Sequence, residues 1–132
     1  MRLMCVPPDM AGQVWPRVRS MAGQAPDKTD MGTLAELDTD VLSGRALLWI
    51  VCEDAIEAAV VTRLDLTEHS KVCTILACGG KNVRKGLHLL DSIESYARVE
   101  GCDGVRLYGR RGWKRALPDY REIGVVMERK LR

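Results

Sequence analysis

The chain begins with a short apolar run and then changes to helical spacing. Residues 3–6 end at Pro7 and Pro8 and predict a short edge strand, because proline lacks the amide that a central strand donates. A helix is expected next, since apolar residues recur at steps of three and four: Ala11, Val14, Trp15, Val18 and Met21. Pro16 interrupts this pattern and predicts a kink or a restart of the helix.

A second short helix is predicted after a polar loop over residues 23–31. Thr33 and Glu36 form a capping box, in which each side chain can satisfy an amide at the helix start. Gly44 is expected to end this helix. Its apolar face consists of Leu34, Leu37, Val41 and Leu42.

The middle of the chain has the sequence pattern of a β-sheet. Residues 46–52, 56–66 and 71–78 are three apolar or β-branched runs separated by short polar turns, which predicts an antiparallel meander. Gly79 and Gly80 are expected to break the third strand.

The last third predicts one long helix between further strands. Asn82 can cap a helix over residues 83–100, ended by Gly101, with an inward face of Val83, Leu87, Leu90, Ile93 and Ala97. A strand over 105–108, a short helix over 112–117 and a closing strand over 123–127 complete the order β-α-α-β-β-β-α-β-α-β. The predicted fold class is α/β (α+β), a central mixed, mostly antiparallel sheet flanked by helices.

Length and composition predict a single domain over residues 1–132. No apolar run reaches the ~18 residues of a membrane span, so no membrane association is expected. The five cysteines are an odd number at irregular spacing, which predicts free, buried thiols in a reducing cytoplasm.

The net charge of +2 conceals an asymmetry between the two parts of the chain. Residues 1–80 hold 7 basic and 11 acidic residues, a net charge of −4, and residues 81–132 hold 13 and 7, a net charge of +6. A basic second part predicts a phosphate-bearing partner, which is either a nucleotide cofactor or a nucleic acid.

The element order and three local features resemble the GNAT (Gcn5-related N-acetyltransferase) superfamily. An apolar strand runs into a glycine-containing loop and a helix, as in the acyl-CoA core of that family. Residues 112–120, GWKRALPDY, resemble its short fourth helix and the aromatic residue after it, and residues 120–131, YREIGVVMERKL, resemble its last strand. Among members, the chain is most similar to short GNAT-like proteins of phage and prophage regions.

The resemblance implies transfer of an acetyl group from acetyl-CoA, or of another acyl group from its CoA ester, to an amine of unknown identity. A free backbone amide near Ile75, Ala77 and Cys78 would polarise the thioester carbonyl. The loop that would hold the pyrophosphate departs from the family pattern: glycines come early, at Gly79 and Gly80, and Arg84 stands where a glycine is usual. The remaining cofactor-binding candidates are Lys81, Lys85 and Gly86.

Two tyrosines compete for the role of proton donor. Tyr108 lies five residues before Trp113, the spacing of the family's Tyr-x-x-x-Gly-aromatic pattern, and would protonate the departing CoA thiolate. In a second alignment with this pattern, Tyr120 takes the place of the aromatic residue instead of Trp113, and no catalytic tyrosine remains. Glu57 is the candidate base, beside weaker candidates in Glu53, Asp54 and His69.

No metal site is predicted, because His88 has no second histidine or carboxylate to complete a ligand set. The alternative function is a non-catalytic GNAT-like protein of phage origin that binds a protein or nucleic acid through its basic C-terminal half. Five cations surround Trp113 and Tyr108 there: Arg106, Arg110, Arg111, Lys114 and Arg115. Nucleic-acid binding is the less favoured of the two functions, and a monomer or a homodimer fits either.

Overall fold

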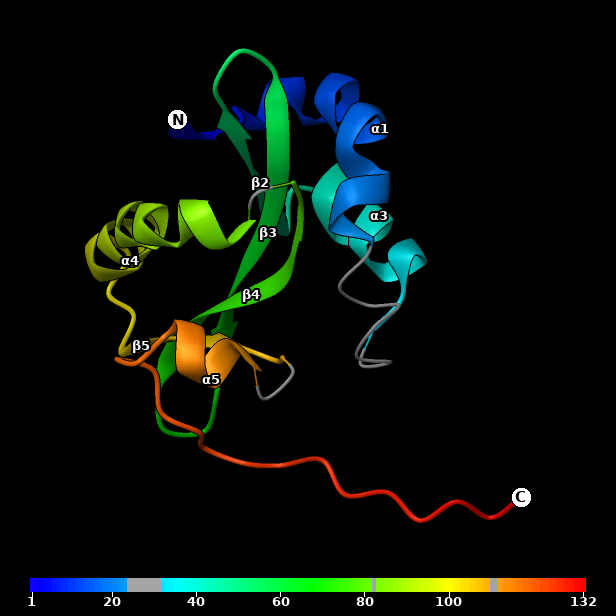
Figure 1. Cartoon of the computed structure of the whole chain (residues 1–132), viewed down its shortest axis with the longest axis vertical. Coiled ribbons are helices and arrows are strands. Elements are labelled where there is room, and N and C mark those ends of the chain that lie inside the picture. The colour runs from blue at the N-terminus through cyan, green and yellow to red at the C-terminus, as the bar shows by residue number, and fades with distance from the viewer. Residues whose placement is uncertain (24–31, 82, 110–111) are drawn as a thin grey trace.

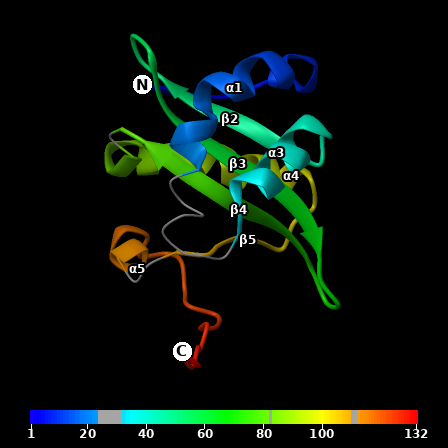
Figure 2. The same ribbon diagram turned by 90° about the vertical axis from the view of Figure 1, so that its right-hand side faces the viewer.

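The computed structural model describes residues 1–23, 32–81, 83–109 and 112–132, and its centre is a five-stranded sheet in the order β1-β2-β3-β4-β5. The strands are β1 (Arg2–Cys5), β2 (Ala46–Cys52), β3 (Ile56–Leu66), β4 (Lys71–Gly80) and β5 (Gly104–Leu107). The helices are the 3-10 helices η1 (Pro8–Met10) and η2 (Val83–Leu89), and α1 (Ala11–Ala22), α3 (Leu34–Leu42), α4 (Leu90–Val99) and α5 (Gly112–Ala116). Helices α1 and α3 cover one face of the sheet, and α4 lies on the other (Figure 1, Figure 2).

Strands β2, β3 and β4 form the antiparallel meander that the sequence predicts, and the edge strand β1 pairs antiparallel with β2. Strand β5 pairs parallel with β4, because α4 carries the chain back along the sheet before β5 begins. The sheet is therefore mixed and mostly antiparallel, as expected. Strand β1 lies at one edge and β5 at the other.

The face of the sheet under α1 and α3 carries the larger core. Trp15 and Val18 of α1, Val41 of α3 and Val61 of β3 are all almost completely buried. Trp15 also donates its indole N–H to Asp38 Oδ1 of α3 at 2.7 Å. One side chain thus fills the core and fixes the two helices to each other.

The second core lies between α4 and the opposite face. Ile93 and Ala97 of α4 are buried against the sheet, as the helical spacing predicts. Trp49 of β2 donates its indole N–H to Thr62 Oγ1 at 2.9 Å, and its ring meets that of Tyr96 edge-on at 5.5 Å between centroids. This core therefore combines aliphatic packing with an aromatic pair and a satisfied polar pair.

A chain of charged groups ties α3 to the middle of the sheet. Arg63 of β3 donates to Asp40 Oδ2 of α3 at 2.9 Å and to Asp65 Oδ1 at 2.7 Å, and Thr74 of β4 donates to Asp65 Oδ2 at 2.7 Å. Burial raises the pKa of the Asp65 carboxyl, but the hydrogen bonds from Arg63 and Thr74 outweigh it and leave the pKa below its usual value. Asp40 is buried, and the Arg63 guanidinium at 2.9 Å is its ion-pair partner.

The long helix predicted over residues 83–100 is two elements. Residues 83–89 form η2, and the α-helix begins only at Leu90. Gly86 lies in the middle of η2. Glycine loses more backbone freedom on folding than any other residue, so it disfavours an α-helix at this position. The predicted cap, Asn82, lies outside the described residues, as does the side chain of Val83; Leu87 and Leu90 are half-buried.

The predicted closing strand is absent from the sheet. Residues 121–132 make no strand pairing and every one of them is exposed. In Figure 1 this segment, coloured orange to red, runs away from the body of the molecule as an extended tail. A strand pattern alone cannot create a strand, because each strand needs a partner edge.

Four smaller expectations also differ from the structure. Gly79 and Gly80 are the last residues of β4 and do not break it early. Helix α1 runs unbroken through Pro16. Proline has no amide to donate to the Gly12 carbonyl, but Gly12 and Pro16 are both exposed, so water can hydrogen-bond to that carbonyl. Leu42, the last residue of α3, is 57% exposed, and Cys5 on the edge strand is exposed, whereas Cys73 is buried.

All five thiols are free. Among the described residues, no helix has the length and apolar content that crossing a bilayer requires.

Replacing Ile93 tests the assignment of the α4 face. Ile93→Ala removes a side chain with no exposed surface, so we expect a loss of about 2–5 kcal/mol in the free energy of unfolding, measured by urea or thermal denaturation. The control is Val99→Ala on the same helix, where the side chain is 85% exposed and the change is expected to stay within about 0.5 kcal/mol. Equal stability of the two variants would show that the face is misassigned.

Candidate functional site

The candidate site begins where β4 and β5 part. The parallel pairing runs from Val72 opposite Gly104 to Ile75 opposite Leu107, and β5 ends there. Strand β4 continues for five more residues to Gly80 while still paired with β3 on its other side. That second half of β4 therefore has no strand partner on the β5 side, and an extended ligand could pair with its main chain there as a strand would.

A bulge lies at the point of the fork. Thr62 of β3 opposes Ile75, but the next residue of β3, Val61, opposes Ala77, so Leu76 has no partner on β3. Leu76 and Ala77 both pack toward the α1 and α3 side, whereas Ile75 and Cys78 pack toward α4. The extra residue interrupts the ladder where β5 stops, which aims the local backbone away from β3.

The end of β4 is held against the start of β3 by a close approach of the two backbones. Gly80 has φ +134°, and a Cβ on it would lie 2.4 Å from the Glu57 carbonyl oxygen and 2.6 Å from Ala58 Cα. The next amide, of Lys81, donates to that same Glu57 oxygen at 2.8 Å. Glycine is required at position 80 by β3, independently of any ligand.

The basic loop follows directly and leads into η2. The Lys81 side chain is exposed, and Gly86 is half-buried, with an added Cβ meeting only the Met1 sulfur at 3.7 Å and a Leu89 methyl at 3.8 Å. The side chains of Arg84 and Lys85 lie outside what the structure describes. Among the described side chains of this loop, Lys81 is an exposed cation, and it directly follows the end of β4.

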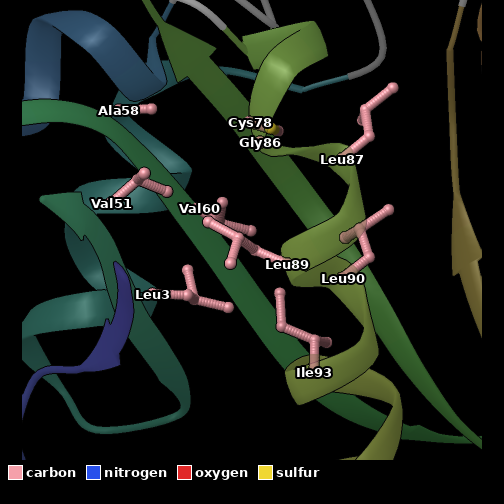
Figure 3. Close-up of a pocket in the computed structure, with 10 residues that line it drawn as sticks. All are labelled: Leu3, Val51, Ala58, Val60, Cys78, Gly86, Leu87, Leu89, Leu90 and Ile93. Atoms are coloured by element: carbon pink, nitrogen blue, oxygen red, sulfur yellow. The ribbon is translucent and has the colours of Figure 1, made fainter. Parts of the chain in front are cut away.

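A small apolar cavity of about 30 Å³ lies beneath this loop, between η2, α4 and the sheet (Figure 3). Its walls are almost entirely aliphatic, and Cys78 is the one sulfur-bearing residue among those that line it. Burial raises the pKa of the Cys78 thiol to about 11, so at neutral pH this group is a thiol and not a nucleophilic thiolate. The lining residues are Leu3, Val51, Ala58, Val60, Cys78, Gly86, Leu87, Leu89, Leu90 and Ile93.

The two tyrosines differ sharply in their surroundings. Tyr108 follows the last residue of β5 and is 65% exposed, on the β5 side of the fork. Tyr120 is half-buried and donates its hydroxyl proton to Glu94 Oε2 of α4 at 2.8 Å. Burial and the neighbouring Glu94 carboxylate raise the pKa of the Tyr120 phenol. Tyr108 is therefore mostly exposed to solvent, and Tyr120 anchors the chain after α5.

The candidate bases are scattered. The half-buried Glu57 lies at the start of β3, beside the end of β4, and its main-chain carbonyl is engaged by Lys81. Glu53 and Asp54 are exposed in the turn before it, and the exposed His69 lies 3.9 Å from Glu68 in the β3–β4 turn, at the other end of those strands. Within the part of the chain that the structure describes, no three or more metal-ligating side chains come together.

Two features of this site escape sequence reasoning. The bulge at Leu76 leaves no mark in the sequence. A strand buried on both faces is apolar throughout, so an extra residue does not disturb any alternation of apolar and polar residues. The reason for Gly80 is also hidden, since a Gly-Gly pair suits a turn, a phosphate loop and a close strand contact equally well. The charge pattern indicated the basic loop, and the family resemblance pointed to the backbone near Ile75, Ala77 and Cys78.

Comparison with solved structures finds a similar fold in several proteins, some of which are described as acetyltransferases. The chain is similar to a predicted acetyltransferase of Clostridium acetobutylicum solved with acetyl-CoA, with a TM-score of 0.68 and 9% identity over 98% of this chain and 96% of that one. It is similar to the aminoglycoside acetyltransferase meta-AAC0020 from an uncultured soil metagenomic sample, with a TM-score of 0.67 and 10% identity over 99% and 96% of the chains. A mutant of the BH1408 protein from Bacillus halodurans aligns over 100% of both chains, with a TM-score of 0.70 and 16% identity.

No family model matches the sequence, and no curated protein matches it in sequence. At identities this low the likeness establishes the fold. The fold is GNAT-like, as the element order predicts.

The contact between Gly80 and β3 generates a stability prediction. Gly80→Ala is expected to lower the free energy of unfolding by about 1–3 kcal/mol from backbone strain alone, and further through the clash with Glu57 and Ala58. Thermal denaturation measures the loss. Gly12→Ala is the control, because a Cβ there meets nothing within 4 Å and the helix gains a better former. A Gly80→Ala protein as stable as wild type would show that the two strands do not approach this closely.

Proposed function

We propose that the protein is an acyl-CoA-dependent N-acyltransferase that transfers an acetyl group from acetyl-CoA to an amine. The observation that carries the proposal is the fork between β4 and β5, with its bulge at Leu76, in a GNAT-like fold. A structural neighbour was solved with acetyl-CoA, which supports the same co-substrate here.

The residues present fit an acyl-CoA in two respects. The open edge of β4 over Leu76 to Cys78 offers main-chain groups to the amides of a pantetheine arm, as an added strand would use them. Beyond it, Gly79, Gly80 and Lys81 lead toward residues 84–86 in the first part of η2, where the sequence concentrates cations, a setting suited to a pyrophosphate.

The reaction joins the amine nitrogen to the thioester carbonyl carbon, breaks the carbon–sulfur bond and releases an amide and CoA. The amide of Leu76 is the proposed donor to the carbonyl oxygen as negative charge develops on it, because the bulge leaves that residue without a partner on β3. Tyr108 is the proposed acid that gives its proton to the departing thiolate, since it follows β5 at the fork and is exposed.

Glu57 is the proposed base, and its distance from the bulge bears on how it would act. It lies beside the end of β4, about five residues from the bulge, which is roughly 15 Å at the rise of a strand. Direct proton transfer over that distance is excluded, so Glu57 would take the amine proton through water molecules. The acceptor amine is open; an aminoglycoside, the substrate class named for one neighbour, belongs in the first panel of amines tested.

Binding of acetyl-CoA is the first test. A ligand that binds only the folded state, at a hundred times its dissociation constant, stabilises it by about 2.7 kcal/mol, which is a rise in Tm of roughly 8 °C for a domain of this size. Lys81→Ala is expected to weaken binding by about 1–3 kcal/mol through the loss of a charge-assisted contact, measured by calorimetry. The control is Arg98→Ala, which removes an exposed cation near the other end of α4.

If neither acetyl-CoA nor CoA raises the Tm, the acyltransferase proposal is refuted. Binding of a nucleic acid that weakens steeply with salt, together with no response to CoA, would instead support the alternative function, for which the exposed Arg106, Lys114 and Arg115 are the candidate contacts.

The two tyrosines separate catalysis from stability. Tyr108→Phe is expected to lower kcat by about 10²–10⁴-fold with little change in the binding of acetyl-CoA, because it removes only the proton donor. Tyr120→Phe is expected to leave kcat nearly unchanged and to lower stability by about 1 kcal/mol, since it breaks the hydrogen bond to Glu94. The assay follows CoA thiol release with a panel of amines. The opposite pattern would give the acid role to Tyr120.

A further inference from the structure

One carboxylate that the proposed reaction does not use lies much nearer the bulge than Glu57 does. Asp65 of β3 accepts a hydrogen bond from Thr74 Oγ1 of β4 at 2.7 Å, and Thr74 comes two residues before Leu76. Two residues of a strand span about 7 Å. The Asp65 carboxylate therefore lies about one strand repeat from the amide that is the proposed donor to the thioester carbonyl.

Asp65, Thr74 and Leu76 lie on the same face of the sheet. Arg63, which donates to Asp65, also donates to Asp40 of α3, so these side chains are on the face that α3 covers. Leu76 packs against the core of that face. An amine held at Asp65 would thus approach the thioester from the α1 and α3 side of the sheet.

The charges around Asp65 suit it to bind a cation. Arg63 is one guanidinium between two carboxylates, Asp40 and Asp65, so the three groups carry a net charge of −1. Arg45 is 3.9 Å from Asp40 Oδ1, and its side chain is 69% exposed, so solvent screens most of its effect on Asp65. The Asp65 side chain itself is 30% exposed and is therefore open to a ligand.

A cation lies on the other side of Thr74, on the same face. Arg106 of β5 is the register partner of Thr74, and its neighbours Val105 and Leu107 pack toward α4. Side chains alternate along a strand, so Arg106 points to the opposite face, the one that carries the Thr74 hydroxyl. The Arg106 side chain is exposed. A carboxylate and a guanidinium therefore flank Thr74, where β4 and β5 are about to part.

We propose that Asp65 and Arg106 bind the acceptor as a zwitterion, with its ammonium group on Asp65 and its carboxylate on Arg106, so that the amine acylated is the α-amino group of an amino acid. This inference rests on the proposed acyltransferase function and names its acceptor class. A guanidinium matches a carboxylate in bidentate geometry, and a carboxylate accepts strong hydrogen bonds from an ammonium. Neighbouring strands are about 4.8 Å apart and arginine is long, so one small molecule above Thr74 reaches both groups.

The bound ammonium must lose one proton before its nitrogen can attack. Despite partial burial, hydrogen bonds from Arg63 and Thr74 keep the pKa of Asp65 below its usual value, so Asp65 holds the ammonium and water takes the proton. The nitrogen then bonds to the thioester carbonyl carbon and the carbon–sulfur bond breaks. A second proton leaves the nitrogen as the amide forms, and Tyr108 protonates the departing thiolate. The products are an N-acyl amino acid and CoA.

Amino acids and the amines that lack only their carboxylate test this site. Serine with ethanolamine and phenylalanine with phenethylamine are two such pairs, and release of the CoA thiol is the readout. The wild type is expected to prefer the amino acid of each pair by about 10- to 100-fold in kcat/KM, the effect of one charge-assisted ion pair.

Two variants separate the two contacts. Arg106→Gln is expected to remove the preference and to leave each pair within about threefold in kcat/KM, because only the carboxylate contact is lost. Asp65→Asn is expected to raise KM by about tenfold or more for both members of a pair, because both carry the ammonium group. Acetyl-CoA binding should be unchanged in both variants. The controls are Arg98→Gln and Glu68→Gln, which remove an exposed cation and an exposed anion elsewhere and should behave as wild type.

Calorimetric binding of the same compounds, with and without CoA, distinguishes this proposal from the acyltransferase proposal. If acetyl-CoA does not raise the Tm but amino acids bind and both variants weaken that binding, the acyltransferase proposal fails and the amino-acid site stands. If acetyl-CoA binds but the amines are acylated as well as the amino acids, or Arg106→Gln keeps the wild-type preference, the amino-acid site is overturned.

A wild-type protein that binds no amino acid in either state also overturns the site. If Asp65→Asn does not fold, as judged by its circular dichroism, Arg106→Gln decides alone, since that side chain is exposed and its replacement leaves the core intact.

Discussion

The unequal pairing of β4 is the constraint on which the rest of the structure depends. On one side β4 pairs antiparallel with β3 along nearly its whole length, and on the other it pairs parallel with β5 over only four residues. Parallel pairing requires a crossover, and α4 supplies it while covering one face of the sheet. The same element that closes the second core therefore sets where β5 begins, and the short β5 sets where the fork opens.

The candidate site is built from places where regular pairing stops, and each stop has a structural cause. Leu76 is the extra residue of a bulge, Gly80 lies against the backbone of β3, and η2 replaces the first turns of an α-helix. Long 3-10 stretches are uncommon, and they often mark strain or a hinge. The loop between β4 and α4 is thus held at its first residue by the Lys81–Glu57 hydrogen bond and is weakly helical beyond it.

Polar groups inside the fold are satisfied, which keeps this arrangement unique. Among the described residues, no buried side-chain nitrogen or oxygen lacks a partner. Arg63 connects Asp40 of α3 with Asp65 of β3, the strand next to β4. The position of α3 is therefore fixed relative to the strands that form the site. Removal of Arg63 would take the nearest cation from the buried Asp40 carboxylate, which is expected to cost stability.

The sequence by itself determined the elements whose signals are local. The meander at 46–52 and 56–66, the Thr33 cap of α3, the buried stripe of Trp15 and Val18, and the basic second part of the chain all follow from spacing, capping and charge. The GNAT-like order of elements followed from these. Local signals suffice there because each residue's preference agrees with its place in the fold.

Only the tertiary structure decided the rest. It placed the bulge at Leu76, the contact of Gly80 with β3, the end of the helical pattern at η2 and the separate roles of Tyr108 and Tyr120. It also left residues 123–127, which have a clear strand pattern, without a strand. Pairing, register and close approach are properties of two segments at once, and a one-dimensional pattern carries information about only one of them.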